Sequence, residues 1–283
     1  MSSTPVALPS SVAEYVEQGF LHNKKKARCR IRSECRLSGV NDISDLILTP
    51  NDFSEARKML DQEAKIVFGD SSALTEQGLF RGVVYCFLTT LQNYDKQITV
   101  FERIIQQGFD TPEAVLRDPT GLLDILNVIF KNQKAGYIRT LAQNWEGLDL
   151  LAKISAAVKT SREDELALRA EVISKVNGLR EKTSSVLLRM CGAEYLVPID
   201  SWMAEILYLH GYSTQMPRRT IERPHFDNAE WHVHQKRKAG LRGAQYLRAE
   251  EQAADLAVRY GVPGYLLQLT YWTKHSTYQK TLS

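Results

Sequence analysis

Two residues of the sequence, Lys182 and Asp200, are the strongest candidates for chemistry. A lysine amine without its proton is a nucleophile, and a carboxylate in a site of low dielectric stabilises positive charge on a reacting carbon. Taken singly, each residue has an ordinary explanation, because most helical lysines face solvent and an aspartate at a helix start usually serves as a cap. Their occurrence together, behind a predicted tight turn, favours a shared active site.

Lys182 belongs to a predicted helix-hairpin-helix that covers about residues 172–190. The pair Asn177-Gly178 is typical of a tight turn, and the second helix should begin near Glu181. Backbone N–H groups at such a turn and at a helix start can bind a DNA phosphate without reading sequence. The pattern therefore places Lys182 in the first turn of the second helix, close to the strand that the hairpin would hold.

Asp200 is expected at the start of the following helix, after Pro198 and before the apolar stretch Trp202–Leu209. A carboxylate at this position can accept a hydrogen bond from the first turn of the helix and still face a cleft. A capping role and a chemical role are therefore compatible.

The net charge is only +3, but the basic residues are concentrated in two parts of the chain. Such clusters suit a polyanion such as nucleic acid, although a solvated surface or a mobile tail explains each cluster about as well. We expect a basic N-terminal segment over residues 1–45 and an insertion over about 213–247, where His232 and His234 lack the spacing of a metal site. The clusters are Lys24, Lys25, Lys26, Arg28, Arg30, Arg32 and Arg36, then Arg218, Arg219, Arg223, Lys236, Arg237, Lys238 and Arg242.

Apolar residues recur at helical spacing along most of the chain, and no segment alternates with the period of a strand. The sequence therefore predicts an all-α fold, with one folded region over residues 46–283. The predicted helices cover Phe53–Phe68 (with Asn51 or Asp52 as cap), Leu79–Thr90, Asp95–Gln107, a short helix from Thr111 and Pro112, Leu122–Phe130, Ala135–Trp145, Glu163–Ser174, Trp202–Leu209, Ala249–Tyr260 and Tyr265–Trp272.

The longest apolar runs are too short to span a bilayer, and no signal peptide is recognisable at the N-terminus. Cys29, Cys35, Cys86 and Cys191 form no CxxC pair and no iron–sulfur spacing, so we interpret them as reduced thiols. These features predict a cytoplasmic protein without membrane contact, associated with the nucleoid in a prokaryote or placed in the nucleus of a eukaryote.

The segment Val-Asn-Gly-Leu-Arg-Glu-Lys at 176–182 resembles the hairpin of the helix-hairpin-helix DNA glycosylases, specifically the 8-oxoguanine DNA glycosylases of the archaeal type. The resemblance implies that Lys182 forms a Schiff base and that Asp200 is the essential carboxylate. It also implies that Asn177, Gly178 and Arg180 contact DNA. The family has a second glycine where this chain has Arg180, and we expect a side chain there to alter the turn and its approach to phosphate.

Residues 87–104 resemble the helix-loop-helix with which the family wedges into duplex DNA. The resemblance implies that Gln92 or Asn93 fills the space left by the extruded base, and that Lys96 contacts the orphaned partner base. Residues 132–138 resemble a segment that starts a core helix of the family.

The stretch Leu267–Trp272, followed by Lys280, resembles the C-terminal tail of the archaeal-type members. The resemblance implies a base pocket in which Trp272 offers a flat apolar face to the extruded base and Lys280 lies nearby. In those relatives the chain ends at the lysine, whereas here Thr281, Leu282 and Ser283 follow, so the terminal carboxylate is displaced.

In all, the resemblance covers about residues 50–210 and 247–283 and implies two helical subdomains with a DNA-binding cleft, one built from the middle of the chain and one from its ends. The implied function is a base-excision repair glycosylase and β-lyase that removes 8-oxoguanine from duplex DNA as a monomer, without metal or organic cofactor. Two alternatives stay open: a glycosylase of this superfamily for another damaged or modified base, and a non-catalytic DNA-binding module. Phosphate binding alone needs neither Lys182 nor Asp200, which argues against the module.

Overall fold

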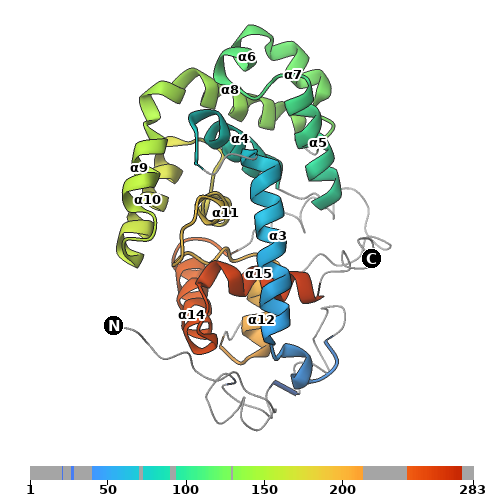
Figure 1. Ribbon diagram of the computed structural model, residues 1–283, viewed down its shortest axis with the longest axis vertical. Helices are drawn as coiled ribbons and strands as arrows, with labels where there is room; N and C mark the ends of the chain where they lie inside the picture. The colour runs from blue at the N-terminus through green and yellow to red at the C-terminus, as the bar shows by residue number, and fades with distance from the viewer. Residues whose placement is uncertain are drawn as a thin grey trace, which may run out of the picture. The chain divides into compact units, whose positions relative to one another are not determined.

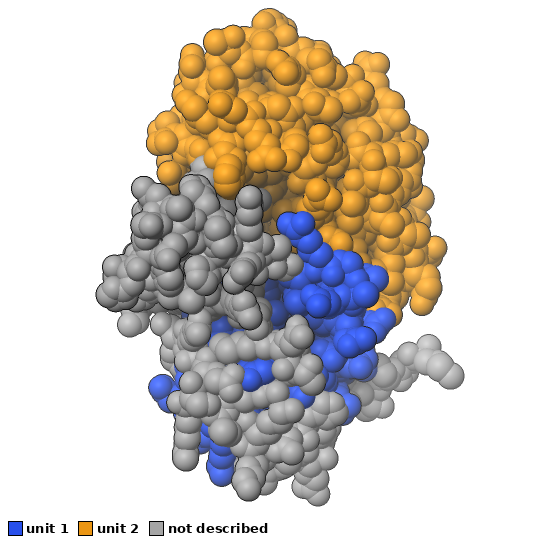
Figure 2. All heavy atoms as spheres, turned by 180° about the vertical axis from the view of Figure 1, so that it is seen from behind, with its two compact units in different colours: residues 1–58, 197–283 blue, residues 59–196 orange. Residues whose placement is uncertain are grey.

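The computed structural model describes residues 21, 27–28, 40–69, 73–89, 94–128, 130–212 and 241–275. Every regular element in these ranges is a helix, which confirms the predicted all-α fold (Figure 1). The chain divides into two compact units, residues 59–196 and residues 1–58 with 197–283 (Figure 2). The middle of the chain thus forms one unit and its two ends form the other, as the family resemblance implies. Within the described ranges, no helix combines the length and the apolar character that crossing a membrane requires.

The unit of residues 59–196 is built around α4 (Glu76–Leu88), which is buried along nearly its whole length. Thr75 caps this helix, because its hydroxyl accepts a hydrogen bond from the Gly78 N–H (3.0 Å). Gly82 allows close packing against α4, because a Cβ at this position would lie only 3.0 Å from Cδ1 of Leu187 and 2.7 Å from Cε1 of Phe68. Around α4 lie α5 (Tyr94–Gln106), α6 (Pro112–Arg117), α7 (Pro119–Ile125), α8 (Lys131–Leu148), α9 (Leu150–Ala157), α10 (Arg162–Lys175) and α11 (Glu181–Met190).

The second unit contains the short 3₁₀ helix η1 (Ile43–Leu46), the start of α3 (Pro50–Phe68), α12 (Ser201–Leu209), α14 (Ala244–Tyr260) and α15 (Gly264–His275). Helix α12 packs against both α14 and α15. The chain before α3 is tied to α15, because the Tyr271 hydroxyl donates to the Leu46 carbonyl (3.0 Å) and the Lys274 amine donates to the Ile47 carbonyl (2.6 Å). Segments from both ends of the sequence thus share one core.

Helix α3 begins at Pro50, so the prediction that Asn51 or Asp52 caps it is wrong. The cap is Thr49, whose hydroxyl accepts from the Asp52 N–H (3.3 Å) while Asp52 Oδ2 accepts from the Thr49 N–H (2.8 Å). Threonine followed by proline is a favoured helix start, because proline at the first helical position has no N–H to leave unpaired. The apolar periodicity begins only at Phe53, and it therefore gave too late a start.

The structure also differs from the sequence prediction at other elements, among them α9, α7 and α14. Helix α9 was not predicted, and it is separated from α8 only by Asp149, which adopts a left-handed conformation (φ 49°). Helix α7 ends at Ile125 rather than at Phe130. Helix α14 begins at Ala244, inside the range 213–247 that the sequence assigned to an insertion.

Candidate active site

The predicted hairpin is present between α10 and α11. Helix α10 ends at Lys175, and the Leu179 N–H donates to the Val176 carbonyl (3.2 Å) across the turn. Gly178 has a φ of +100°, and a Cβ at this position would lie 2.5 Å from Cδ2 of Tyr137. Both the backbone conformation and the close approach therefore require glycine.

Tyr137 of α8 forms the support beneath this turn. Its ring packs against Phe87 with centroids 5.6 Å apart, and its hydroxyl accepts a hydrogen bond from Gln133 Nε2 (2.7 Å). Sequence reasoning treated residues 132–138 as a core segment only. The same segment also holds the hairpin in place.

Gly178→Ala should destabilise the protein and weaken its binding to DNA. A side chain must then adopt a positive φ and displace Tyr137, which together should cost about 2 kcal/mol or more. Denaturant unfolding gives the stability, and titration of undamaged duplex gives the affinity. The matched control is Gly136→Ala in α8, where nothing lies within 4 Å of the new Cβ. That variant should be neutral or slightly stabilising, and equal losses in both variants would show that the turn has no special requirement.

Arg180, which stands in place of the family's second glycine, follows the turn without backbone strain. Its backbone is extended (φ −136°, ψ 176°), a conformation open to any residue. Its N–H donates to Thr183 Oγ1 (2.8 Å), which ties the turn to the first turn of α11. The Arg180 side chain is exposed, so it is available to a bound phosphate.

Three backbone N–H groups around the hairpin, those of Asn177, Gly178 and Lys182, have no acceptor in the part of the chain that the structure describes. Two belong to the turn and one to the first turn of α11, where the positive end of the helix dipole adds to their effect. This arrangement suits an anion such as a DNA phosphate.

Lys182 lies in the first turn of α11 and is partly buried. Its ammonium group acts electrostatically on the Cys86 thiol of α4. Burial above all raises the pKa of Cys86 well above its ordinary value, and burial raises the pKa of Cys191 to about 12. The two cysteines in the described part of the chain therefore stay thiols at neutral pH, and neither is a competing nucleophile.

The far end of α11 is anchored by a buried ion pair. Arg189 Nη2 lies 2.6 Å from Glu63 Oε2, and the Tyr85 hydroxyl donates to the other oxygen of Glu63 (2.7 Å). In the middle of the helix, Ser185 Oγ accepts a hydrogen bond from Arg169 Nη1 (3.0 Å). These contacts fix the rotation of α11 about its axis, and with it the direction of Lys182.

Asp200 begins α12 as predicted. Its Oδ1 accepts a hydrogen bond from the Met203 N–H (2.8 Å), and its Oδ2 accepts one from Gln268 Nε2 of α15 (3.3 Å). Gln268 is buried, and Trp272 lies one helical turn later on the same face of α15. The structure thus brings Asp200 to the helix face that carries Trp272. Sequence reasoning missed Gln268, although it lies inside the stretch that resembles the family tail.

Of the remaining predicted site residues, Lys96 lies in the described part of the chain. Lys96 lies exposed in the first turn of α5. Gln92, Asn93 and Lys280 lie outside the described residues, as do His232, His234 and most of the two basic clusters.

Lys134 of α8 is buried and donates a hydrogen bond to the Leu88 carbonyl at the end of α4 (3.4 Å). Desolvation lowers the pKa of Lys134 from 10.5 to about 8. Lys134 therefore supports the end of the helix that leads to residues 90–93.

The free energy of unfolding should rise with pH between about 8 and 10.5 because of Lys134. In this window the unfolded lysine still holds its proton while the folded one has lost it, so proton release favours the folded state. Lys134→Met should remove a rise of about 1–3 kcal/mol over that range, measured by denaturant unfolding at several pH values. Lys131→Met, at the exposed start of α8, should keep the rise. Identical pH profiles for wild type and Lys134→Met would contradict the assignment.

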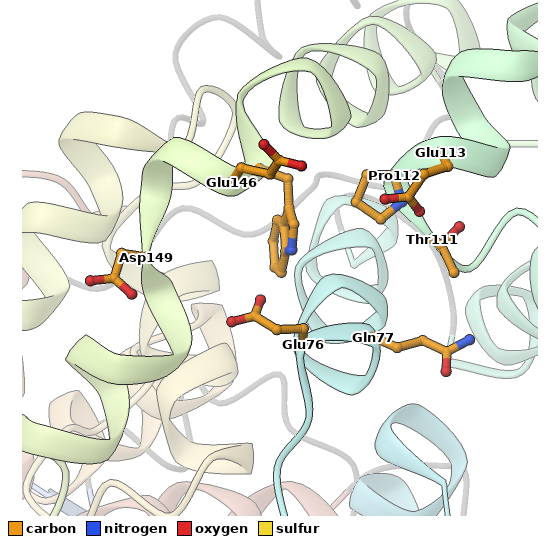
Figure 3. Close-up of a pocket in the computed structure, with 8 residues that line it drawn as sticks. Glu76, Gln77, Thr111, Pro112, Glu113, Glu146 and Asp149 are labelled. Atoms are coloured by element: carbon orange, nitrogen blue, oxygen red, sulfur yellow. The ribbon is translucent and has the colours of Figure 1, made fainter.

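The unit of residues 59–196 also has an acidic pocket of about 470 Å³ (Figure 3). It contains none of the predicted site residues, and its carboxylates would repel a phosphate. We therefore assign no DNA contact to it. Its lining residues are Glu76, Gln77, Thr111, Pro112, Glu113, Trp145, Glu146 and Asp149.

Comparison with solved structures finds the same fold in proteins of low sequence identity. The 8-oxoguanine DNA glycosylase of Thermotoga maritima is 20% identical with a TM-score of 0.53, over 78% of this chain and 91% of that one. The 8-oxoguanine glycosylase/lyase of Methanocaldococcus jannaschii, solved with a 15mer DNA containing 8-oxoguanine, is 19% identical with a TM-score of 0.53, over 82% of this chain and 97% of that one. A second structure, of the 8-oxoguanine DNA glycosylase of the same organism, is 20% identical with a TM-score of 0.53, over 82% of this chain and 93% of that one.

A search of curated protein sequences finds no match. The family described as 8-oxoguanine DNA glycosylase, however, matches residues 62–239, which is more than half of the chain. This match includes the hairpin, Lys182 and Asp200, and it confirms the family that those residues predicted. The chain therefore belongs to the 8-oxoguanine DNA glycosylase family, the DNA repair enzymes that excise this oxidised base.

Proposed function

We propose that the protein excises 8-oxoguanine from duplex DNA and then cleaves the strand, with Lys182 as nucleophile and Asp200 as the carboxylate that stabilises the reacting sugar. The observation that carries this proposal is the position of Lys182 in the first turn of α11, directly after a hairpin whose free N–H groups find no acceptor among the described residues. A phosphate held at the hairpin would keep the sugar-phosphate backbone within reach of the Lys182 amine.

The chemistry follows from the needs of the glycosidic bond. As the bond between C1′ and the base breaks, positive charge develops on the sugar, and the Asp200 carboxylate would stabilise it. The neutral amine of Lys182 would form a bond to C1′ while the base leaves with the bonding electrons. Loss of a proton from nitrogen and opening of the sugar ring give an imine, and removal of a proton from C2′ expels the 3′ phosphate by β-elimination. No metal or organic cofactor is needed for these steps.

The test of this function is a panel of duplexes that carry 8-oxoguanine, other oxidised or modified bases, or an abasic site. Excision of 8-oxoguanine with a β-elimination product at the 3′ end is the expected result. The solved relative in complex with DNA containing 8-oxoguanine supports this choice of substrate. Preference for another base would favour the alternative function, that of a glycosylase of this superfamily with a different base pocket. Binding without cleavage of any duplex would favour a non-catalytic module.

For the base pocket, we propose that Trp272 provides the face on which the extruded base stacks. It is partly buried, one turn from Gln268, which contacts Asp200. Recognition of 8-oxoguanine also needs an acceptor for its N7 proton, because guanine would place an unpaired acceptor there.

Trp272→Ala should lower excision of 8-oxoguanine by about tenfold or more, with a much smaller loss on an abasic site. An abasic site has no base to stack, so its cleavage is the internal control. Single-turnover rates on both substrates measure the difference. A parallel loss of both activities would show that Trp272 supports the fold instead.

We also propose that the protein works on DNA as a monomer in the cytoplasm, associated with the nucleoid, or in the nucleus of a eukaryote. Sedimentation of the protein with and without a short duplex tests the first point, with a single protein per duplex as the expected result.

A further inference from the structure

The segment Val197–Ile199, which leads directly into Asp200, is buried and not helical. Backbone N–H groups in such a segment need acceptors from elsewhere, because no helix or sheet ladder supplies them. Pro198 has no N–H, so Val197 and Ile199 carry the only backbone donors of the segment. Whatever accepts these two hydrogen bonds determines where the segment runs.

Both donors bind side chains of one helix, α14. The Val197 N–H donates to Glu250 Oε1 (3.2 Å), and the Ile199 N–H donates to the Tyr246 hydroxyl (3.1 Å). That hydroxyl in turn donates to the Val197 carbonyl (3.3 Å), so Tyr246 bridges the two sides of Pro198. Tyr246 and Glu250 lie one turn apart and are each 1% exposed. The segment is therefore held at two points by a buried pair on a single rigid element.

We propose that Tyr246 and Glu250 are positioning residues for the Asp200 carboxylate. This proposal rests on the proposed role of Asp200 in excision. By holding Val197 and Ile199, the pair sets the position of the Asp200 backbone, while Met203 and Gln268 set the direction of its carboxylate. Charge stabilisation depends steeply on this placement, since a shift of about 1 Å can cost up to a hundredfold in rate.

Tyr246→Phe tests the pair, because it removes the hydroxyl and keeps the buried ring. The single-turnover rate of 8-oxoguanine excision should fall about tenfold, while cleavage of an abasic site, which depends on Lys182, should change by less than about twofold. The difference between the excision rate and the abasic-site cleavage rate is the decisive measurement, since a general loss of folded protein would lower both rates together. Thermal unfolding of each variant ensures that the rates are measured on folded protein.

Tyr260→Phe is the matched control. Tyr260 lies on the same helix and is also buried (3% exposed). Its hydroxyl accepts a hydrogen bond from the N–H of Leu48 (3.3 Å), which is far from Asp200 in the sequence. The two variants should lose similar stability. Only Tyr246→Phe should slow excision.

Glu250 provides a second, independent test. Glu250→Gln keeps an oxygen that can accept from the Val197 N–H, so excision should stay within about threefold of the wild-type rate. Glu250→Leu removes the acceptor and should lower excision about tenfold or more, again with a smaller effect on abasic-site cleavage. Rescue by glutamine would show that the hydrogen bond, rather than the charge, positions the segment.

The outcomes separate this proposal from the role of Asp200. If Tyr246→Phe lowers both activities in parallel, or if Tyr260→Phe slows excision equally, the pair only supports the fold and the proposal is overturned. If Asp200→Asn loses excision while Tyr246→Phe and Glu250→Leu keep it, the positioning role is wrong and the role of Asp200 stands. If Asp200→Asn itself excises at the wild-type rate, the proposed role of Asp200 is wrong and the positioning role goes with it.

Discussion

Lys182→Ala should abolish the covalent complex that borohydride traps between the protein and duplex DNA containing 8-oxoguanine. Borohydride reduces an imine to a stable amine, so trapping reports the Schiff base itself. Without the Lys182 amine no imine can form at C1′, and we expect both trapping and strand cleavage to fall by about a hundredfold or more. Because the hairpin N–H groups remain, affinity for undamaged duplex should change by less than about threefold.

The matched control is Lys175→Ala, at the end of the first helix of the same motif. Lys175 is exposed and pairs with Glu171 Oε1 at 2.9 Å, so its loss removes a nearby positive charge without touching the turn. This variant should trap DNA as wild type does. Undiminished trapping by Lys182→Ala would remove Lys182 from the mechanism, and mass analysis of the trapped peptide would then identify the amine. Lys134 is the obvious second candidate, since its pKa of about 8 leaves part of it neutral, although it is buried and bound to the Leu88 carbonyl.

The hairpin and the cap at Asp200 could be predicted from sequence because their signals are local. Asn177 and Gly178 restrict the backbone at the positions they occupy, and Asp200 caps a helix that starts one residue later. Such patterns need only a few neighbouring residues.

The contacts that hold these residues in place could not be predicted in the same way. Tyr137 supports Gly178, and Gln268 and Tyr246 reach Asp200 and its neighbours from helices far along the chain. Helical periodicity shows which face of each helix is buried, but not which residue of another helix it meets. A buried tyrosine or glutamine on such a face reads as ordinary core until the partner is known.

Asp200→Asn should lower 8-oxoguanine excision by about a hundredfold or more while the protein stays folded and bound to DNA. Asparagine caps a helix about as well as aspartate, so its Oδ1 can keep the hydrogen bond from the Met203 N–H. The second contact must adjust, because the new amide and the Gln268 amide would otherwise both donate. A flip of Gln268 solves this, and we expect a stability loss of about 1 kcal/mol or less.

Asp118→Asn is the matched control for the cap. Asp118 begins α7, and its Oδ1 accepts from the Gly121 N–H at 2.8 Å, so the same substitution changes the same kind of contact far along the sequence. Its excision rate should equal that of wild type.

For Asp200→Asn, excision should fall further than cleavage of an abasic site, because only the first reaction builds positive charge on an intact sugar ring. Near-wild-type excision by Asp200→Asn, with unfolding unchanged, would reduce Asp200 to a helix cap and leave the charge on the sugar to be stabilised by another group.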